Sequence, residues 1–194
     1  MSAIAGAAPK RREPVVASGV LAMLLFIFTE VMLFSGLISA FKIVKAAAPG
    51  GVWPPPGQPR LPVEATAFNT FALVASGVVM YFAARAYYQK REELSRKLLA
   101  VAMGLGLFFV LFQGVEWVEM LSMGLTMTSS THGSFFYLVV GFHGVHAVLA
   151  VVVLGWLYLR MREGEVKKSQ MQTTAIFWYF VVGLWPVLYW QVYL

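Results

Sequence analysis

The chain contains no cysteine among its 194 residues, and only 12% of its residues are charged. Without cysteine it can form no disulfide bond, thiolate-bound copper site, iron–sulfur cluster or covalently attached c-type haem. A soluble domain of this length would carry roughly a quarter charged residues. The low charged fraction therefore argues against a soluble domain, and the formal net charge of +6 does not by itself indicate nucleic-acid binding.

Five long apolar stretches account for a composition that is 59% hydrophobic. A helix of about 20 residues crosses the roughly 30 Å hydrocarbon core of a bilayer, because each residue adds about 1.5 Å. The first stretch is too long for a signal-peptide core and lacks a small-residue cleavage site, so we expect it to be retained. The predicted fold is an all-α membrane protein, a bundle of five transmembrane helices in a single domain. The predicted segments are a tail at 1–16 and spans at about 17–41, 64–88, 98–125, 134–159 and 173–194, within a domain of 1–194.

The basic residues predict how this bundle is oriented. Twelve lysines and arginines fall on the side that holds the tail, and three fall on the opposite side. Because cytoplasmic segments of membrane proteins are enriched in Lys and Arg, the N-terminus is predicted to be cytoplasmic and the C-terminus outside. We expect the membrane itself to be a bacterial-type cytoplasmic (inner) membrane. The twelve are Lys10, Arg11, Arg12, Arg85, Lys90, Arg91, Arg96, Lys97, Arg160, Arg162, Lys167 and Lys168, and the three are Lys42, Lys45 and Arg60.

Polar side chains recur at three-residue spacing in the third and fourth apolar stretches. Gln113, Glu116 and Glu119 are predicted to share one helix face, and so are His143 and His146. The polar link between the two stretches is short, so the two helices should be antiparallel neighbours. Because ionisable groups inside spanning helices normally face a protein interior or water, we expect a buried polar core in which Glu116 contacts a histidine.

Glu30 is the one charged residue of the first apolar stretch. It is either a structural carboxyl hydrogen-bonded to a neighbouring helix or an acid that handles protons or faces lipid headgroups. Di-iron sites in helical bundles use Glu-x-x-His pairs, whereas His143 and His146 form a His-x-x-His pair that points in one direction, which also disfavours a bis-histidine haem. We therefore predict no catalytic residue, cofactor or metal in this chain itself.

Three segments carry a resemblance to a known family. Glu30 lies in FTEVMLFSGL, Gln113 and Glu116 lie in LFQGVEWVEM, and the fourth stretch reads GSFFYLVVGFHGVHAVLAVVVL. These segments resemble the S-E-V-x-F-F-A-G, Q-x-x-E-Y and G-S-x-F-F-x-x-T-G-F-H-G-x-H-V motifs of subunit III of the haem-copper respiratory oxidases. The likeness extends from Phe28 to Tyr193. In the last motif it is carried by Gly133, Ser134, Gly141, Phe142, His143, Gly144 and His146.

The last apolar stretch departs from the family pattern. FWYFVVGLW is similar to the family's Y-W-H-F-V-D-x-V-W, but Tyr179 stands where the histidine is expected and Val182 where the aspartate is expected. A polar pair that usually contributes to the buried network is therefore missing. Alongside a cytochrome c oxidase, this departure leaves open a quinol oxidase or the subunit-III-like component of a nitric oxide reductase.

The resemblance implies a non-catalytic accessory subunit of a proton-pumping oxidoreductase. Such a subunit lies beside subunit I, which carries haem and copper, and it associates with subunit II and further subunits. It binds phospholipid and supports proton uptake during aerobic electron transport. Glu30 corresponds to the family's carboxylate in the first matched helix and becomes the proton-associated candidate. Larger members have seven spans, and the five here are similar to the last five.

Two functions from other classes compete with this interpretation. A small proton-coupled transporter would use Glu30, Glu116 and the histidines as a proton path, although the sequence shows no internal repeat or paired broken helices, which such folds often contain. A membrane enzyme with its own di-metal centre would retain bound metal in the isolated chain. The identity of the electron donor depends on subunit II and is not determined by this chain.

Overall fold

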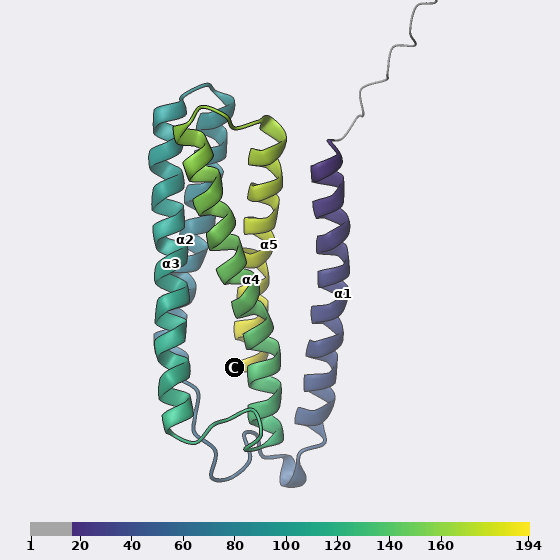
Figure 1. Cartoon of the computed structure of the whole chain (residues 1–194). Helices are drawn as coiled ribbons and strands as arrows, with labels where there is room; N and C mark the ends of the chain where they lie inside the picture. Colours follow the sequence, from purple (N-terminus) through teal and green to yellow (C-terminus); the bar gives the residue numbers. More distant parts are fainter. Residues whose placement is uncertain (1–16) are drawn as a thin grey trace, which may run out of the picture.

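The computed structural model describes residues 17–194 (Figure 1). Within this range it contains long α-helices, one short 3₁₀ helix and no strand. The five long helices are each apolar and long enough to cross a membrane, which confirms the predicted all-α, five-helix fold. They are α1 (Ser18–Ala46), α2 (Val63–Tyr88), α3 (Glu92–Ser122), α4 (Thr131–Arg162) and α5 (Lys168–Val192), with the short helix η1 (Pro49–Gly51) after α1. The tail predicted at 1–16, with its basic residues, lies outside the described residues.

The third helix begins earlier than the predicted span, because charged residues extend it beyond the apolar stretch. Glu92 and Glu93 occupy the first turn of α3, where carboxylates interact favourably with the helix dipole. Lys97 lies one turn later and pairs with Glu93 at 2.8 Å. The helix ends at Ser122, before the predicted limit, and Gly124 then adopts a φ of +86° that few residues other than glycine tolerate.

The bundle consists of α2, α3, α4 and α5, and α1 lies along one side of it (Figure 1). The first helix packs against α5 and α4, and it buries only Val20, Phe34 and Phe41. Figure 1 also shows that the start of α1, the α2–α3 connection and the α4–α5 connection lie at one end of the molecule, opposite the C-terminus. As predicted, α3 and α4 are antiparallel neighbours.

Glycines allow the helices of this bundle to approach closely at two places. A Cβ atom on Gly106 of α3 would lie 2.8 Å from Cζ2 of the buried Trp178 on α5, and closer still to its Cη2. A Cβ atom on Gly77 of α2 would lie 2.9 Å from Cγ1 of Val182. Since small residues allow such close packing between spanning helices, these contacts set the position of α5 against α2 and α3.

Candidate functional site

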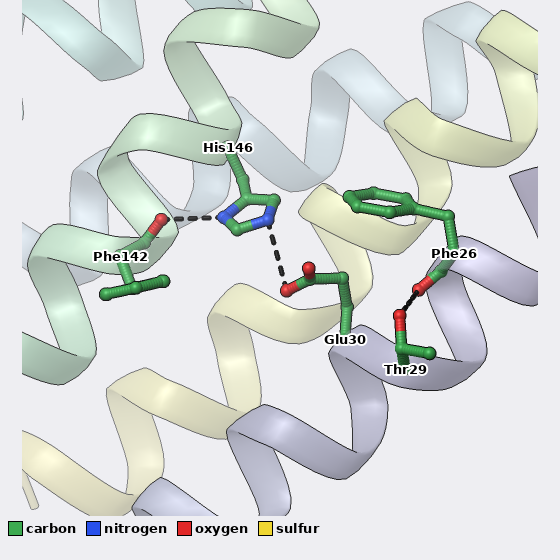
Figure 2. Close-up of polar contacts among 5 residues, drawn as sticks. All are labelled: Phe26, Thr29, Glu30, Phe142 and His146. Carbon is green, nitrogen blue, oxygen red and sulfur yellow. Dashed lines mark hydrogen bonds and ion pairs between the residues drawn. The ribbon is translucent and has the colours of Figure 1, made fainter.

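Two ionisable side chains meet between α1 and α4 (Figure 2). Nε2 of His146 lies 3.2 Å from Oε2 of Glu30, and Nδ1 lies 2.7 Å from the carbonyl oxygen of Phe142. A carbonyl oxygen only accepts, so Nδ1 carries a proton and donates it. Nε2 then either faces a protonated Glu30 or, as part of an imidazolium, pairs with the Glu30 carboxylate. In both arrangements the pair is neutral overall.

The contact between Glu30 and His146 is sheltered by aromatic rings. The imidazole lies with its centroid 5.7 Å from that of Phe34, 6.3 Å from that of Phe26 and 6.3 Å from that of Phe180. The side chains of Glu30 and His146 are only 14% and 9% exposed. Nε2 of His146 and Oε2 of Glu30 lie within ion-pair distance at 3.2 Å, and their geometry is not that of a regular hydrogen bond. Such an interaction is stronger in these apolar surroundings than in water.

A second polar cluster joins α2, α3 and the end of α5. The Glu116 carboxylate lies 2.8 Å from Nε2 of Gln113 and 3.0 Å from the hydroxyl of Thr66, and the Gln113 amide also lies 3.3 Å from the Tyr193 hydroxyl. The Thr66 hydroxyl is in addition 2.9 Å from the carbonyl oxygen of Pro62. A hydroxyl has a single proton, so it donates either to Pro62 or to Glu116, and in the first case Glu116 must itself be the donor.

His143 has different surroundings from His146. It is fully buried, and its ring centroid lies 5.0 Å from that of Trp185 and 6.3 Å from that of Phe109. Neither of its ring nitrogens has a hydrogen-bond partner among the described residues. His143 therefore packs against aromatic side chains of α3 and α5 and takes no part in the contact between α1 and α4.

Two parts of the predicted polar core are wrong: Glu119 is not buried, and Glu116 contacts no histidine among the described residues. Gln113 and Glu116 are buried, but Glu119 is exposed. Three residues turn a helix by about 300°, so each step falls about 60° short of a full turn, and two steps bring Glu119 out of the buried face. The histidine that contacts a carboxylate is His146, and its partner is Glu30 on α1, whereas the described residues show no contact between Glu116 and a histidine.

Thr66 and Tyr193 are members of the polar cluster that the sequence interpretation missed. Two further buried polar residues follow Thr66 on α2: Asn69 three residues later, and Ser76 seven residues after Asn69. That spacing is the helical period of a buried face, and it marks α2 as a source of hydrogen-bond partners. Tyr193 carries no comparable signal, because aromatic residues are also common at membrane boundaries.

At the two positions that depart from the family motif, the polar pair gives way to an apolar contact and a partly exposed phenol. Val182 is 9% exposed and packs against Gly77 on α2. Tyr179 is 38% exposed on α5, where it faces a cavity next to α2. At position 182 an aliphatic side chain therefore packs against a glycine.

Within residues 17–194, no group of three or more histidine, cysteine, aspartate or glutamate side chains is arranged to hold a metal ion. Glu30 and His146 are two side chains of a type that can bind metal, but they contact each other and no third one lies with them among the described residues. Helices of spanning length with ionisable side chains enclosed between them define an integral, multi-pass membrane protein.

Comparison with known proteins identifies the family. The profile of the family "Cytochrome c oxidase subunit III" matches residues 5–194. Cytochrome c oxidase subunit 3 of Oryctolagus cuniculus is 31% identical over 188 residues, which cover 93% of this chain and 71% of that protein. Cytochrome c oxidase subunit 3 of Equus caballus is 32% identical over 178 residues, which cover 88% of this chain and 67% of that protein. The chain belongs to the cytochrome c oxidase subunit III family, which confirms the resemblance found in its motifs.

Proposed function

We propose that this chain is the non-catalytic subunit III of a haem-copper respiratory oxidase of the cytochrome c oxidase type. It contacts subunit I directly, it associates with subunit II and other subunits, and haem and copper reside in these partners. Membership of the family supports this proposal, and so does the match over residues 5–194. The continuous long helices of the described part favour this function over a transporter, whose folds often contain paired broken helices.

The proposal includes an orientation in a bacterial-type inner membrane, with the N-terminus in the cytoplasm. The end of the molecule that holds the α2–α3 and α4–α5 connections carries nine of the lysines and arginines of the described residues, and the opposite end carries three. An excess of basic residues marks the cytoplasmic side. The whole chain, 1–194, would then act as one membrane domain that also binds phospholipid.

Glu30 is the proton-associated residue of this proposal, and its contact with His146 is the observation that carries it. Because Nδ1 of His146 is committed to Phe142, the proton between Nε2 and the carboxyl oxygen can lie on either residue without changing the net charge of the pair. The proton can therefore pass between the two residues while the pair stays neutral. Because a net charge inside the membrane is costly, a proton that leaves the pair must be replaced by another one. Gln113, Glu116 and His143 are assigned a structural role.

The test is the variant Glu30→Gln in the complete oxidase complex. The glutamine amide can donate to Nε2 of His146 and so preserve the contact between α1 and α4, but it cannot release a proton at neutral pH. We expect normal assembly and haem content, together with slower proton uptake and earlier loss of activity during sustained turnover. Glu119→Gln is the matched control, because it neutralises an exposed carboxylate. Unchanged proton uptake and sustained turnover in Glu30→Gln would exclude the proton role.

The assignment to an oxidase is tested separately. The tagged chain is purified from its native membranes in mild detergent, and a reduced-minus-oxidised spectrum is recorded. Haem bands together with larger co-purifying subunits are the expected result. A colourless chain that purifies alone would refute the assignment and would direct attention to transport assays and metal analysis.

A further inference from the structure

A cavity of about 670 Å³ lies between α1, α2 and α5 at the end of the molecule that carries the basic connections. Its walls come from the first turn of α1, the last two turns of α2 and the first half of α5, and these helix ends are at the top of Figure 1. The volume falls in the range of roughly 300–1,000 Å³ that is usual for small-molecule sites. Its polar side chains are Tyr81, Arg85, Tyr88, Gln89, Gln172 and Tyr179.

The cavity is polar near the ends of α2 and α5, and its wall on α5 becomes apolar further into the helix. Tyr81, Arg85 and Tyr88 follow one another at intervals of four and three, so they occupy one face of α2. From Tyr81 to Gln89 this face is about 12 Å long, at about 1.5 Å per residue. On the opposite wall, Ala175 and Ile176 of α5 form an apolar surface. The cavity therefore extends from the predicted membrane boundary into the hydrocarbon region.

Arg85 is the only charged side chain among the described residues that line this cavity. It is exposed, and no ion pair within residues 17–194 involves it. A guanidinium binds phosphate oxygens through two parallel hydrogen bonds, and tyrosine hydroxyls and glutamine amides supply further donors. Since no carboxylate of residues 17–194 lines the cavity, the charge of its described lining is complementary to an anion.

We propose that this cavity is a binding site for one phospholipid, whose phosphodiester is held by Arg85 and whose acyl chain lies against Ala175 and Ile176. Basic pockets between helices on the cytoplasmic side suit anionic lipid headgroups, because the anionic lipids of that leaflet are attracted to the positive charge. The site specifies where and through which chemistry the lipid binding of the proposed function takes place. It rests on the proposed membrane orientation and is independent of the assignment to an oxidase.

The experiment uses the purified native complex after detergent washing, and it measures retained phospholipid by native mass spectrometry. Phosphatidylglycerol is then added back in a titration, with phosphatidylcholine and inorganic phosphate as the comparison probes. We expect Arg85→Gln to retain one phospholipid fewer and to bind phosphatidylglycerol about tenfold or more weakly, as the loss of a charged hydrogen bond implies. Arg162→Gln is the matched control, because it removes an exposed positive charge outside this cavity.

A second variant keeps the charge and fills the apolar part of the site. Ile176→Trp should displace the acyl chain and lower lipid retention even though Arg85 is present, and it keeps the test decisive if Arg85→Gln does not accumulate. If both variants retain as much phospholipid as the wild type, the proposal of a lipid site in this cavity is refuted. Displacement of the lipid by inorganic phosphate would show a site for free anions, and loss of a protein subunit in place of a lipid would show a protein interface. Both results would also overturn the proposal, whereas a complex without haem would refute only the oxidase assignment.

Discussion

Replacing Gly106 with alanine tests the closest helix contact in the bundle. The added Cβ atom would lie 2.8 Å from Cζ2 of Trp178, closer still to its Cη2, and 3.3 Å from Cγ2 of Val151. Optimal contact between carbon atoms lies at about 3.5–4.0 Å. Trp178 is 1% exposed, so its indole has little room to move aside. Alanine at position 106 must therefore push α3 and α5 apart.

The size of the effect follows from a comparison within the same helix. Overpacking of a well-packed core typically costs about 1–3 kcal/mol. Alanine is also a better helix former than glycine by about 1 kcal/mol, which acts in the opposite direction. Gly104→Ala gains the same helix propensity but meets no atom within 4 Å. We therefore expect Gly106→Ala to be less stable than Gly104→Ala by about 1–3 kcal/mol, because the propensity contribution cancels between the two variants.

The assay is unfolding of the purified protein in mixed micelles with an increasing mole fraction of sodium dodecyl sulfate, followed by circular dichroism. Gly106→Ala should unfold at a lower mole fraction than the wild type, and Gly104→Ala at an equal or slightly higher one. If the two variants unfold together, the close contact between α3 and the Trp178 indole does not exist in the folded protein.

Three further predictions follow from the same geometry. Gly144→Ala should cost less than Gly106→Ala, since its Cβ atom meets the partly exposed Trp117 ring, which is free to shift; an equal loss in the same unfolding assay would contradict this. Thr66→Val should lower stability by about 1–3 kcal/mol, because the buried Glu116 loses a hydrogen-bond partner, and a neutral effect would show that the cluster is not needed. Glu119→Gln should change stability by less than about 0.5 kcal/mol, since this side chain is exposed, and a larger loss would place it in a buried contact.

The positions of the helices could be predicted well from the sequence, and the members of the candidate site only in part. Long uncharged stretches require helices, because every backbone polar group inside a bilayer must be satisfied within the segment. The spacing of Gln113 and Glu116 correctly predicted two buried polar residues on α3. Extending the same spacing to Glu119 failed, because an interval of three residues drifts around the helix with each repeat.

The sequence by itself determined that this protein crosses a membrane with five helices, that it contains no cysteine and that its motifs are those of the subunit III family. These properties depend on the composition and on the order of neighbouring residues, both of which can be read directly from the sequence. Only the tertiary structure decided that His146 meets Glu30, 116 positions earlier in the chain, while His143 packs against Trp185. Such pairings depend on how α1, α4 and α5 rotate and dock against one another, and small residues with close packing at the interfaces set those rotations.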